Sequence, residues 1–301
     1  MDLKKIHRPL RKALRNAFSL IEISLVILII GILVAGISKA IDLHRDARLS
    51  ASKSLTVNTQ VHRIPNLIMW MESTQERNFD RNEVVNNGLI TNWYDANPNA
   101  NVRGSLSITN VAFKPKYNSE GINGLPTVKF DGTDYLASTF YRINGSKLSY
   151  FVVSKRNACS INTSTLVGYR NGVIHDYNNV QSFVGFYEGP ACERLNPYLS
   201  KSLSDIVPHP GNNNPYIASA VYDGTKNTAY LNGKAYPAVS IANVNLAVDN
   251  ILLCARMATS SINAYCNAEI GEVIIYDRDL SDVERKDIEN YLSKKWAIKL
   301  N

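Results

Sequence analysis

The sequence predicts an α+β protein with a long N-terminal transmembrane helix, a mainly antiparallel β-sandwich and a C-terminal helix. Three observations support this fold class. Residues 18–37 are apolar except for one acid, over a length that suits a helix across a bilayer. From about residue 64, short apolar segments alternate with Asp-Gly and Asn-Gly turns, which favour antiparallel hairpins. Residues 281–296 carry the signals of a capped helix.

The basic residues of the chain are concentrated at its N-terminus. The protein has 301 residues and a formal net charge of +7. Its first 17 residues hold six basic side chains and one acid, Asp2, so the rest of the chain carries only about +2. A nearly neutral body does not indicate a nucleic-acid partner. Because basic residues are retained on the cytoplasmic side of a membrane, the cluster predicts a cytoplasmic N-terminus and an exported remainder.

The apolar run is expected to continue into a longer helix. Residues 18–37 would span about 30 Å, which is the thickness of the hydrocarbon core of a bilayer. Ala51 and Leu55 keep an approximately helical spacing beyond this run. The helix is therefore expected to reach about Val57, before Pro65 ends it.

The four cysteines all lie in the exported part of the chain. They are even in number and have no spacing typical of zinc ligands, which predicts two disulfides in an oxidising compartment. Of the three pairings we favour sequence neighbours, Cys159 with Cys192 and Cys254 with Cys266. Each bridge would contribute roughly 3 to 4 kcal/mol in the chain-entropy model. Four buried free thiols are the alternative.

Glu22 is the acid inside the apolar run, and it distinguishes three interpretations of the N-terminus. A secretory signal peptide would end in a small-residue cleavage site, which residues 38–40 formally supply. A plain membrane anchor gives no reason for an acid, because an isolated carboxylate in lipid is costly. The third interpretation gives the acid a partner.

The segment RNAFSLIEISLVILIIGILVAG, residues 15–36, resembles the N-terminal signature of type IV pilins and pseudopilins. The resemblance implies that prepilin peptidase cuts between Ala17 and Phe18 and methylates the new amine of Phe18. It also implies that Glu22 pairs with this amine in a neighbouring subunit, because a buried ion pair fixes the register of helices in a filament. The domains would be a cleaved leader, 1–17, a transmembrane and assembly helix, 18–63, and an exported head, 64–301.

Two departures from the pilin signature refine this expectation. Ala17 stands before the cleavage point, where glycine is commoner in the family. The proline that many major pilins carry farther along the helix is missing. The second departure favours a pseudopilin or a minor pilin.

The head is predicted to be one large sandwich closed by a helix. Apolar segments meet turns at 131–132, 223–224 and 232–233, and the tally of expected strands passes seven. In the closing helix, Ser281 and Glu284 have the spacing of a capping box. Its apolar residues, which are expected to pack on the sandwich, are Val283, Ile288, Leu292 and Trp296.

A second resemblance covers roughly residues 66–300. The blocks LIMWMEST, ITNWYDAN, INGLPTVKFDGTDYL, YIASAVYDGTKNTAYLNGK and GEVIIYDRDLSDVERKDIENYLSKKWAI resemble, in this order, elements of laminin-G-like domains of the concanavalin A-like jelly roll. The resemblance implies a domain that binds glycans or proteins, in a fold that also includes some glycosidases.

The acids of the head do not have the spacing expected for glycoside hydrolysis, which needs two carboxylates about 5 Å apart. The closest candidates, Asp277, Asp279 and Asp282, straddle a strand end and a helix start, where acids favour the helix dipole. We therefore expect no enzymatic activity, no cofactor and no metal site, with calcium at Asp131 or Asp134 as the alternative to the last. Trp93 and Tyr94 are the candidate ligand-binding aromatics, although burial in the core is the alternative for this tryptophan.

Together these features predict a pilin-like subunit, minor pilin or pseudopilin, of a type IV pilus or type II secretion filament. Its jelly-roll head would serve adhesion or ligand binding. The expected partners are prepilin peptidase, other pilin subunits, the bacterial inner membrane, and a glycan or surface protein. The head would lie in the periplasm or on the cell surface. The alternative is a membrane-anchored or secreted carbohydrate-binding or carbohydrate-active protein with no filament role.

Overall fold

The computed structural model describes residues 19–160, 162–172, 175–176, 181–189, 192–199, 202–203, 207–241 and 244–301. The chain divides into two compact units, 1–47 and 48–301.

The long helix α1 spans Leu20–Val57. Its apolar part is long and apolar enough to cross a membrane, and none of it is buried within the protein. At the start of the helix the backbone N–H of Ser19 donates to Glu22 Oε2 at 2.8 Å, and the Ser19 hydroxyl accepts from Ile21 N–H at 3.2 Å, so both side chains cap the first turn. The expected end of the helix near Val57 is confirmed.

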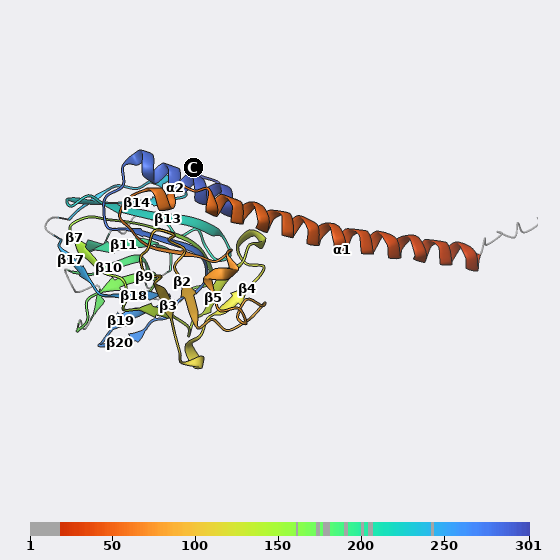
Figure 1. The fold of residues 1–301 in the computed structure, drawn as a ribbon, viewed down its shortest axis with the longest axis horizontal. Coiled ribbons are helices and arrows are strands. Elements are labelled where there is room, and N and C mark those ends of the chain that lie inside the picture. Colours follow the sequence, from red (N-terminus) through yellow and green to blue (C-terminus); the bar gives the residue numbers. More distant parts are fainter. Residues whose placement is uncertain are drawn as a thin grey trace, which may run out of the picture. The chain divides into compact units, whose positions relative to one another are not determined.

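In the described part of the second unit, the strands form two main sheets with antiparallel ladders (Figure 1). Sheet A has nine strands in the order β15 (Lys234–Ala235), β14 (Lys226–Leu231), β13 (Pro215–Tyr222), β8 (Leu148–Ala158), β21 (Asn267–Tyr276), β5 (Thr127–Asp131) and β4 (Lys116–Asn118), with β1 (Leu67–Glu72) on β21 and β16 (Val239–Ser240) on β14. Sheet B has eight strands in the order β12 (Ser202–Leu203), β11 (Asn196–Leu199), β10 (Phe183–Glu188), β9 (Thr163–Tyr169), β18 (Asn250–Leu253), β6 (Leu136–Ser138), β3 (Ser105–Ser107) and β2 (Asn92–Tyr94).

Smaller elements complete the unit. Two strand pairs are β17 (Leu246–Val248) with β7 (Ile143–Gly145) and β19 (Arg256–Ala258) with β20 (Ser261–Asn263). Short 3-10 turns lie at Val61–Arg63, Glu76–Asn78, Val111–Phe113 and Ile122–Gly124, and helix α2 spans Asp282–Trp296.

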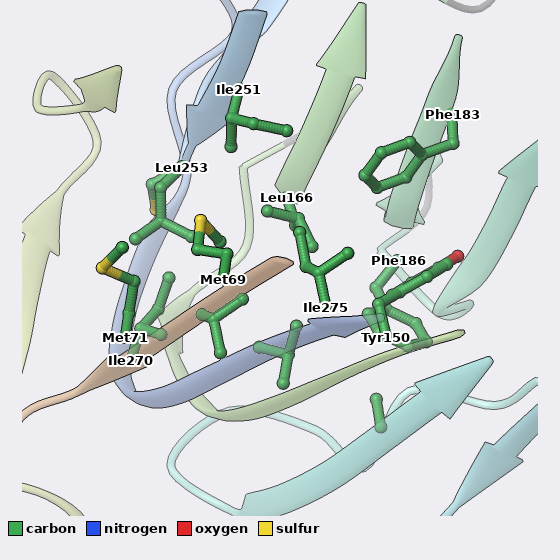
Figure 2. Packing of buried hydrophobic residues seen from close by; sticks show 14 of the residues in the cluster. Met69, Met71, Tyr150, Leu166, Phe183, Phe186, Ile251, Leu253, Ile270 and Ile275 are labelled. Carbon is green, nitrogen blue, oxygen red and sulfur yellow. The ribbon is translucent and has the colours of Figure 1, made fainter. Parts of the chain in front are cut away.

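The main core lies between the two sheets. Figure 2 shows Met69 and Ile275 of sheet A meeting Leu166, Phe183 and Leu253 of sheet B, all of them buried. Burying side chains of this size contributes roughly 1.5 to 3 kcal/mol each.

Helix α2 covers the outer face of sheet A, over β13 and β14 (Figure 1). Ile288, Leu292 and Trp296 pack there with strand residues, as the spacing predicts, while Val283 is 70% exposed and does not. The predicted capping box between Ser281 and Glu284 is present. The predicted fold class, a long N-terminal helix, a mainly antiparallel sandwich and a C-terminal helix, is confirmed.

A bulge in β21 changes which face of sheet A its side chains point to. The register against β8 shifts between Ile270 and Glu272, so Ile270 and Val273 both face the main core while Glu272 faces α2. Gly271 sits at the shift, and a Cβ added there would lie 2.5 Å from Trp296 Cη2. Glycine is therefore required for the close approach of α2.

Candidate functional site

A pocket of about 700 Å³ lies on the outer face of sheet B. Strands β10 and β11 supply Val184, Tyr187 and Tyr198, and the β19–β20 hairpin supplies Arg256 and Asn263. The remaining described lining residues are Asn162, His175, Ala258, Thr259 and Ala264. Its volume lies within the range of ordinary ligand sites.

A bulge in β10 points Tyr187 into the pocket. Phe183 and Phe186 are three residues apart, a spacing that puts side chains on opposite faces of a regular strand. Both nevertheless pack on the core residue Tyr150, each with ring centroids 5.3 Å away (Figure 2). The change of face occurs at Phe186, whose φ is +57°, and the register against β11 shifts between Val184 and Tyr187. Tyr187 is thereby turned outward beside Val184.

The β19–β20 hairpin forms one wall of the pocket. Its two turn residues, Thr259 and Ser260, have φ values of +53° and +64°, the conformation that a two-residue hairpin needs. A β-branched residue with positive φ is strained, so the surrounding structure must hold this turn in place. The backbone N–H of Thr259 donates to His175 Nδ1 at 3.1 Å.

Both predicted disulfides are present, and each closes a segment that contributes residues to the pocket. Cys254–Cys266 joins the two ends of the β19–β20 hairpin, with its Cα atoms 4.9 Å apart. Cys159–Cys192 joins the segment after β8 to the segment before β11, with its Cα atoms 5.9 Å apart.

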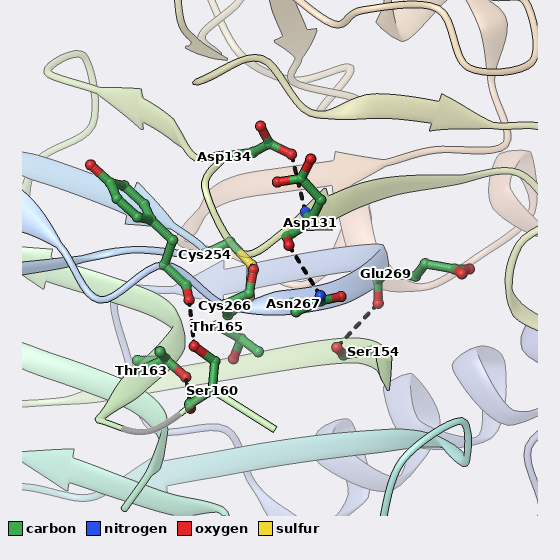
Figure 3. The surroundings of a disulfide bond; sticks show 12 residues. Asp131, Asp134, Ser154, Ser160, Thr163, Thr165, Cys254, Cys266, Asn267 and Glu269 are labelled. Carbon is green, nitrogen blue, oxygen red and sulfur yellow. Dashed lines mark hydrogen bonds between the residues drawn. A yellow bond between two sulfur atoms is a disulfide. The ribbon is translucent and has the colours of Figure 1, made fainter. Parts of the chain in front are cut away.

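Hydrogen bonds connect the segment between β8 and β9 to the segment that follows β20. The Ser160 hydroxyl donates to the backbone oxygen of Tyr265, and the Thr163 hydroxyl donates to that of Ser160 (Figure 3). These bonds lie beside the Cys254–Cys266 bridge, so the covalent and polar constraints act on the same wall.

A buried ion pair supports the tyrosine of the pocket. Arg256 Nη2 lies 2.6 Å from Asp176 Oδ1, and both side chains are almost fully buried. The Arg256 guanidinium lies 4.9 Å over the ring of Tyr187. The Tyr187 hydroxyl donates to Asn162 Oδ1 at 2.7 Å, which fixes the ring at its other end.

A second aromatic side chain stands beside this ring. Tyr198 meets Tyr187 with ring centroids 6.4 Å apart and planes at 70°. Both tyrosines are only partly buried. In the same hydrophobic cluster, burial raises the pKa of Tyr169 to about 12, so this hydroxyl stays neutral at physiological pH.

The residues proposed from the sequence do not line this pocket. Trp93 is fully buried in the core and donates from Nε1 to the backbone oxygen of Glu72 at 3.2 Å, so its proposed role in ligand binding is corrected. Tyr94 is partly buried, with Arg103 5.1 Å from its ring centre and its hydroxyl donating to Asp80. Ala17 and Phe18 lie outside the described residues, and Glu22 accepts a hydrogen bond from the backbone N–H of Ser19 at the start of α1.

The acids near the start of α2 have local partners. Asp279 pairs with Lys147 at 2.9 Å, and Asp282 lies 3.4 Å from Arg285 within the helix. Burial raises the pKa of Asp277. Within the described residues, no group of three or more His, Cys, Asp or Glu side chains is arranged to hold a metal ion.

The sequence offered little to identify Tyr187, Tyr198 and Arg256 as a group. They lie far apart along the chain, and the direction of Tyr187 depends on a bulge. The available signal was the cysteine spacing, because the two bridges enclose every described lining residue except Tyr198.

No protein-family model matches the sequence, and no curated protein matches it either. Among solved structures, the chain is similar to a GH54 α-L-arabinofuranosidase, with a TM-score of 0.52, 11% identity, and coverage of 69% of this chain and 51% of that chain. It is also similar to domain 4 of a GH43 extracellular arabinanase from Geobacillus stearothermophilus, in complex with arabinotriose, with a TM-score of 0.49, 13% identity, and coverage of 75% and 98%. A third match is a sialidase from Trypanosoma rangeli, with a TM-score of 0.46, 9% identity, and coverage of 74% and 32%.

At these identities the likeness shows the fold alone. This chain spans about half the length of the arabinofuranosidase chain. The expectation that the chain is not an enzyme is nevertheless wrong as it stands, because its fold matches that of a glycoside hydrolase. The sequence criterion considered acids close together along the chain, whereas the fold also brings acids together from separate strands. Glu72 of β1 and Glu272 of β21, which both bond to Lys295, are an example, although they are fully buried and line no described pocket.

Proposed function

We propose that this chain is a membrane-anchored protein that binds carbohydrate in the pocket on the outer face of sheet B. The observation that carries the proposal is the pair of partly buried tyrosines, Tyr187 and Tyr198, in a pocket that also holds amide side chains. Aromatic rings stack on the apolar faces of sugars, while amides bond to sugar hydroxyls. The fold shared with an α-L-arabinofuranosidase supports a carbohydrate ligand.

The anchor and the disulfides support a location outside the cytoplasm. Helix α1 has the length and apolar composition of a membrane span. The disulfides suit an oxidising compartment. We infer attachment to a bacterial inner membrane, with the head on its outer side.

The test uses the full chain, purified in detergent, on an array of oligosaccharides, with calorimetry on the sugars that bind. Tyr187→Ala and Tyr198→Ala are each expected to weaken binding at least about tenfold, a loss of about 1.4 kcal/mol. Assays of the same sugars for hydrolysis separate binding from turnover.

Tyr94→Ala is the matched control, because Tyr94 has an arginine over its ring as Tyr187 does, but lies outside the pocket. It is expected to bind as the wild type does. If Tyr94→Ala alone abolished binding, the ligand site would be at β2, and the pocket would be the wrong site.

A second candidate function is that of a filament subunit. It is favoured by the unbroken helix Leu20–Val57, whose apolar part is exposed, and by Glu22 in its first turn. In this proposal prepilin peptidase cuts before Phe18, and α1 assembles with the helices of other pilin subunits. A carbohydrate-binding head and a filament helix are compatible in one chain.

N-terminal sequencing of the membrane-extracted protein tests this second candidate. Methylated Phe18 as the first residue supports it. A first residue at Ile41 supports a secretory signal, and an intact Met1 supports a plain anchor. Glu22→Val should leave insertion intact but reduce incorporation into filaments, and normal incorporation would contradict the pairing role of Glu22.

A further inference from the structure

We propose that the pocket selects uncharged saccharides and discriminates against those that carry a carboxylate. This inference rests on the proposed carbohydrate-binding function and names the class of ligand. It follows from the arrangement of charge around Arg256.

Arg256 is the only described lining residue with a permanent charge, and that charge is already compensated. Its Nη2 lies 2.6 Å from Asp176 Oδ1, and its Nε donates to Asp176 Oδ2 at 3.3 Å. Its Nη1 donates to the backbone oxygen of Asn162 at 3.0 Å. This two-point pairing is the geometry that a ligand carboxylate would itself require.

The carboxylate of Asp176 is likewise engaged in hydrogen bonds within the protein. Its side chain is fully buried, and its Oδ2 also accepts from the backbone N–H of Met257 at 3.2 Å. A ligand carboxylate that took Arg256 would leave Asp176 buried without its counter-charge, which is strongly unfavourable. A carboxylate that left this pair intact would give up hydration without gaining an uncompensated positive charge in return.

The Arg256 guanidinium is also held by the ring of Tyr187, 4.9 Å from its centre. Turning it toward a ligand would remove this contact and the support of the aromatic wall. The Arg256–Asp176 pair therefore supports the ring of Tyr187 without adding net charge to the pocket.

The other polar lining groups suit hydroxyls. Asn162 Oδ1 accepts from Tyr187, and Asn263 Nδ2 donates to the backbone oxygen of Ala258 at 3.2 Å, so both amides are oriented before a ligand arrives. An amide and a hydroxyl such as that of Thr259 each offer both a donor and an acceptor, as a sugar hydroxyl does. These groups provide no charge to compensate an acidic ligand.

The experiment measures binding of the full chain in detergent to neutral pentose and hexose oligosaccharides. The same measurement is made on oligosaccharides of equal length that carry a uronate or a terminal sialic acid. Neutral sugars are expected to bind at least about tenfold more tightly. Their affinity should change less than about twofold between roughly 0.05 and 0.5 M salt, because no net charge is neutralised on binding.

The variant Asp176→Asn removes the compensating charge while keeping the size of the side chain. It is expected to gain affinity for the carboxylated sugars, at least about fivefold at low salt, and this gain should disappear at high salt. The salt dependence of the wild type gives an independent test should the variant not fold.

The outcomes separate the two proposals. Tight, salt-sensitive binding of carboxylated sugars by the wild type, with weak binding of neutral ones, would overturn the selectivity and leave the binding function standing. Failure to bind any sugar of either panel would overturn the binding function, and the selectivity with it.

Discussion

The hydroxyl of Tyr291 on α2 lies 3.4 Å from the hydroxyl of Thr56, in the last turns of α1. Both residues are buried, and Leu49 and Leu55 pack on the same cluster between α2 and sheet A. The end of α1 is therefore part of the head, and the second structural unit begins at Arg48.

The fragment 48–301 is accordingly expected to be more stable than the fragment 64–301. The shorter fragment lacks Leu49, Leu55 and the fully buried Val61, so it should lose on the order of 3 kcal/mol or more of unfolding free energy. Urea unfolding of the two fragments measures the difference. Equal stabilities would show that the helix end contributes nothing to the head.

A buried lysine joins α2 to sheet A. Lys295 Nζ lies 2.5 Å from Glu72 Oε1 and 2.9 Å from Glu272 Oε2, and all three side chains are fully buried. Lys295→Met is expected to cost about 3 to 5 kcal/mol, because it leaves two buried carboxylates without a counter-charge. Thermal or urea unfolding of the soluble fragment 48–301 gives the value.

The neighbouring Lys294 provides the control, since it is exposed on the same helix. Lys294→Met should change stability by less than about 0.5 kcal/mol. A similar loss in both variants would mean that helix propensity or net charge, and not the buried network, explains the result.

The buried carboxyl of Asp95 predicts a dependence of stability on pH. Burial raises its pKa from 3.8 to about 6, although it accepts hydrogen bonds from the N–H groups of Trp70 and Asn97 and from the Tyr141 hydroxyl. Between these pH values the folded state binds more protons than the unfolded state. The contribution of Asp95 to stability therefore falls as pH rises from about 4 to about 6, by up to about 3 kcal/mol.

Asp95→Asn is expected to flatten this part of the pH profile. An amide oxygen at this position can still accept from both N–H groups, while its NH₂ can donate to the Tyr141 hydroxyl. Burial also raises the pKa of Asp134 to about 6, so part of the slope should persist in the variant. A variant whose unfolding free energy keeps the full wild-type slope between pH 4 and 6 would contradict the assignment to Asp95.

Features that depend on local spacing could be predicted from the sequence. The end of α1 near Val57 and the Ser281–Glu284 capping box depend on residues a few positions apart, and both are confirmed. The disulfides also follow from sequence proximity, because short loops are the easiest to close.

The candidate site depends on features that local spacing does not reveal. The outward direction of Tyr187 results from a bulge at Phe186, and a shift of one residue reverses the face of every side chain beyond it. Arg256 and Asp176 meet from distant segments. Trp93, a candidate ligand-binding aromatic with burial as its alternative, lies on β2 with its ring in the core.

The two disulfides are expected to serve different roles, which paired alanine variants can separate. Cys159–Cys192 closes the longer loop, with a sequence separation of 33 against 12 for Cys254–Cys266. In the chain-entropy model the longer loop is worth about 4 kcal/mol and the shorter about 3.

The shorter bridge, however, holds the hairpin that carries Arg256 and Asn263. Replacing both Cys254 and Cys266 by alanine should therefore weaken sugar binding at least about tenfold while the protein stays folded. The reason is that the hairpin turn at Thr259 and Ser260 is strained and relaxes once the ends of the hairpin are free. Replacing Cys159 and Cys192 should lower the unfolding free energy more and affect binding less. Calorimetry with a neutral oligosaccharide compares the affinities of the two variants, and urea unfolding compares their unfolding free energies. Unchanged affinity after loss of Cys254–Cys266 would show that the hairpin does not shape the ligand site.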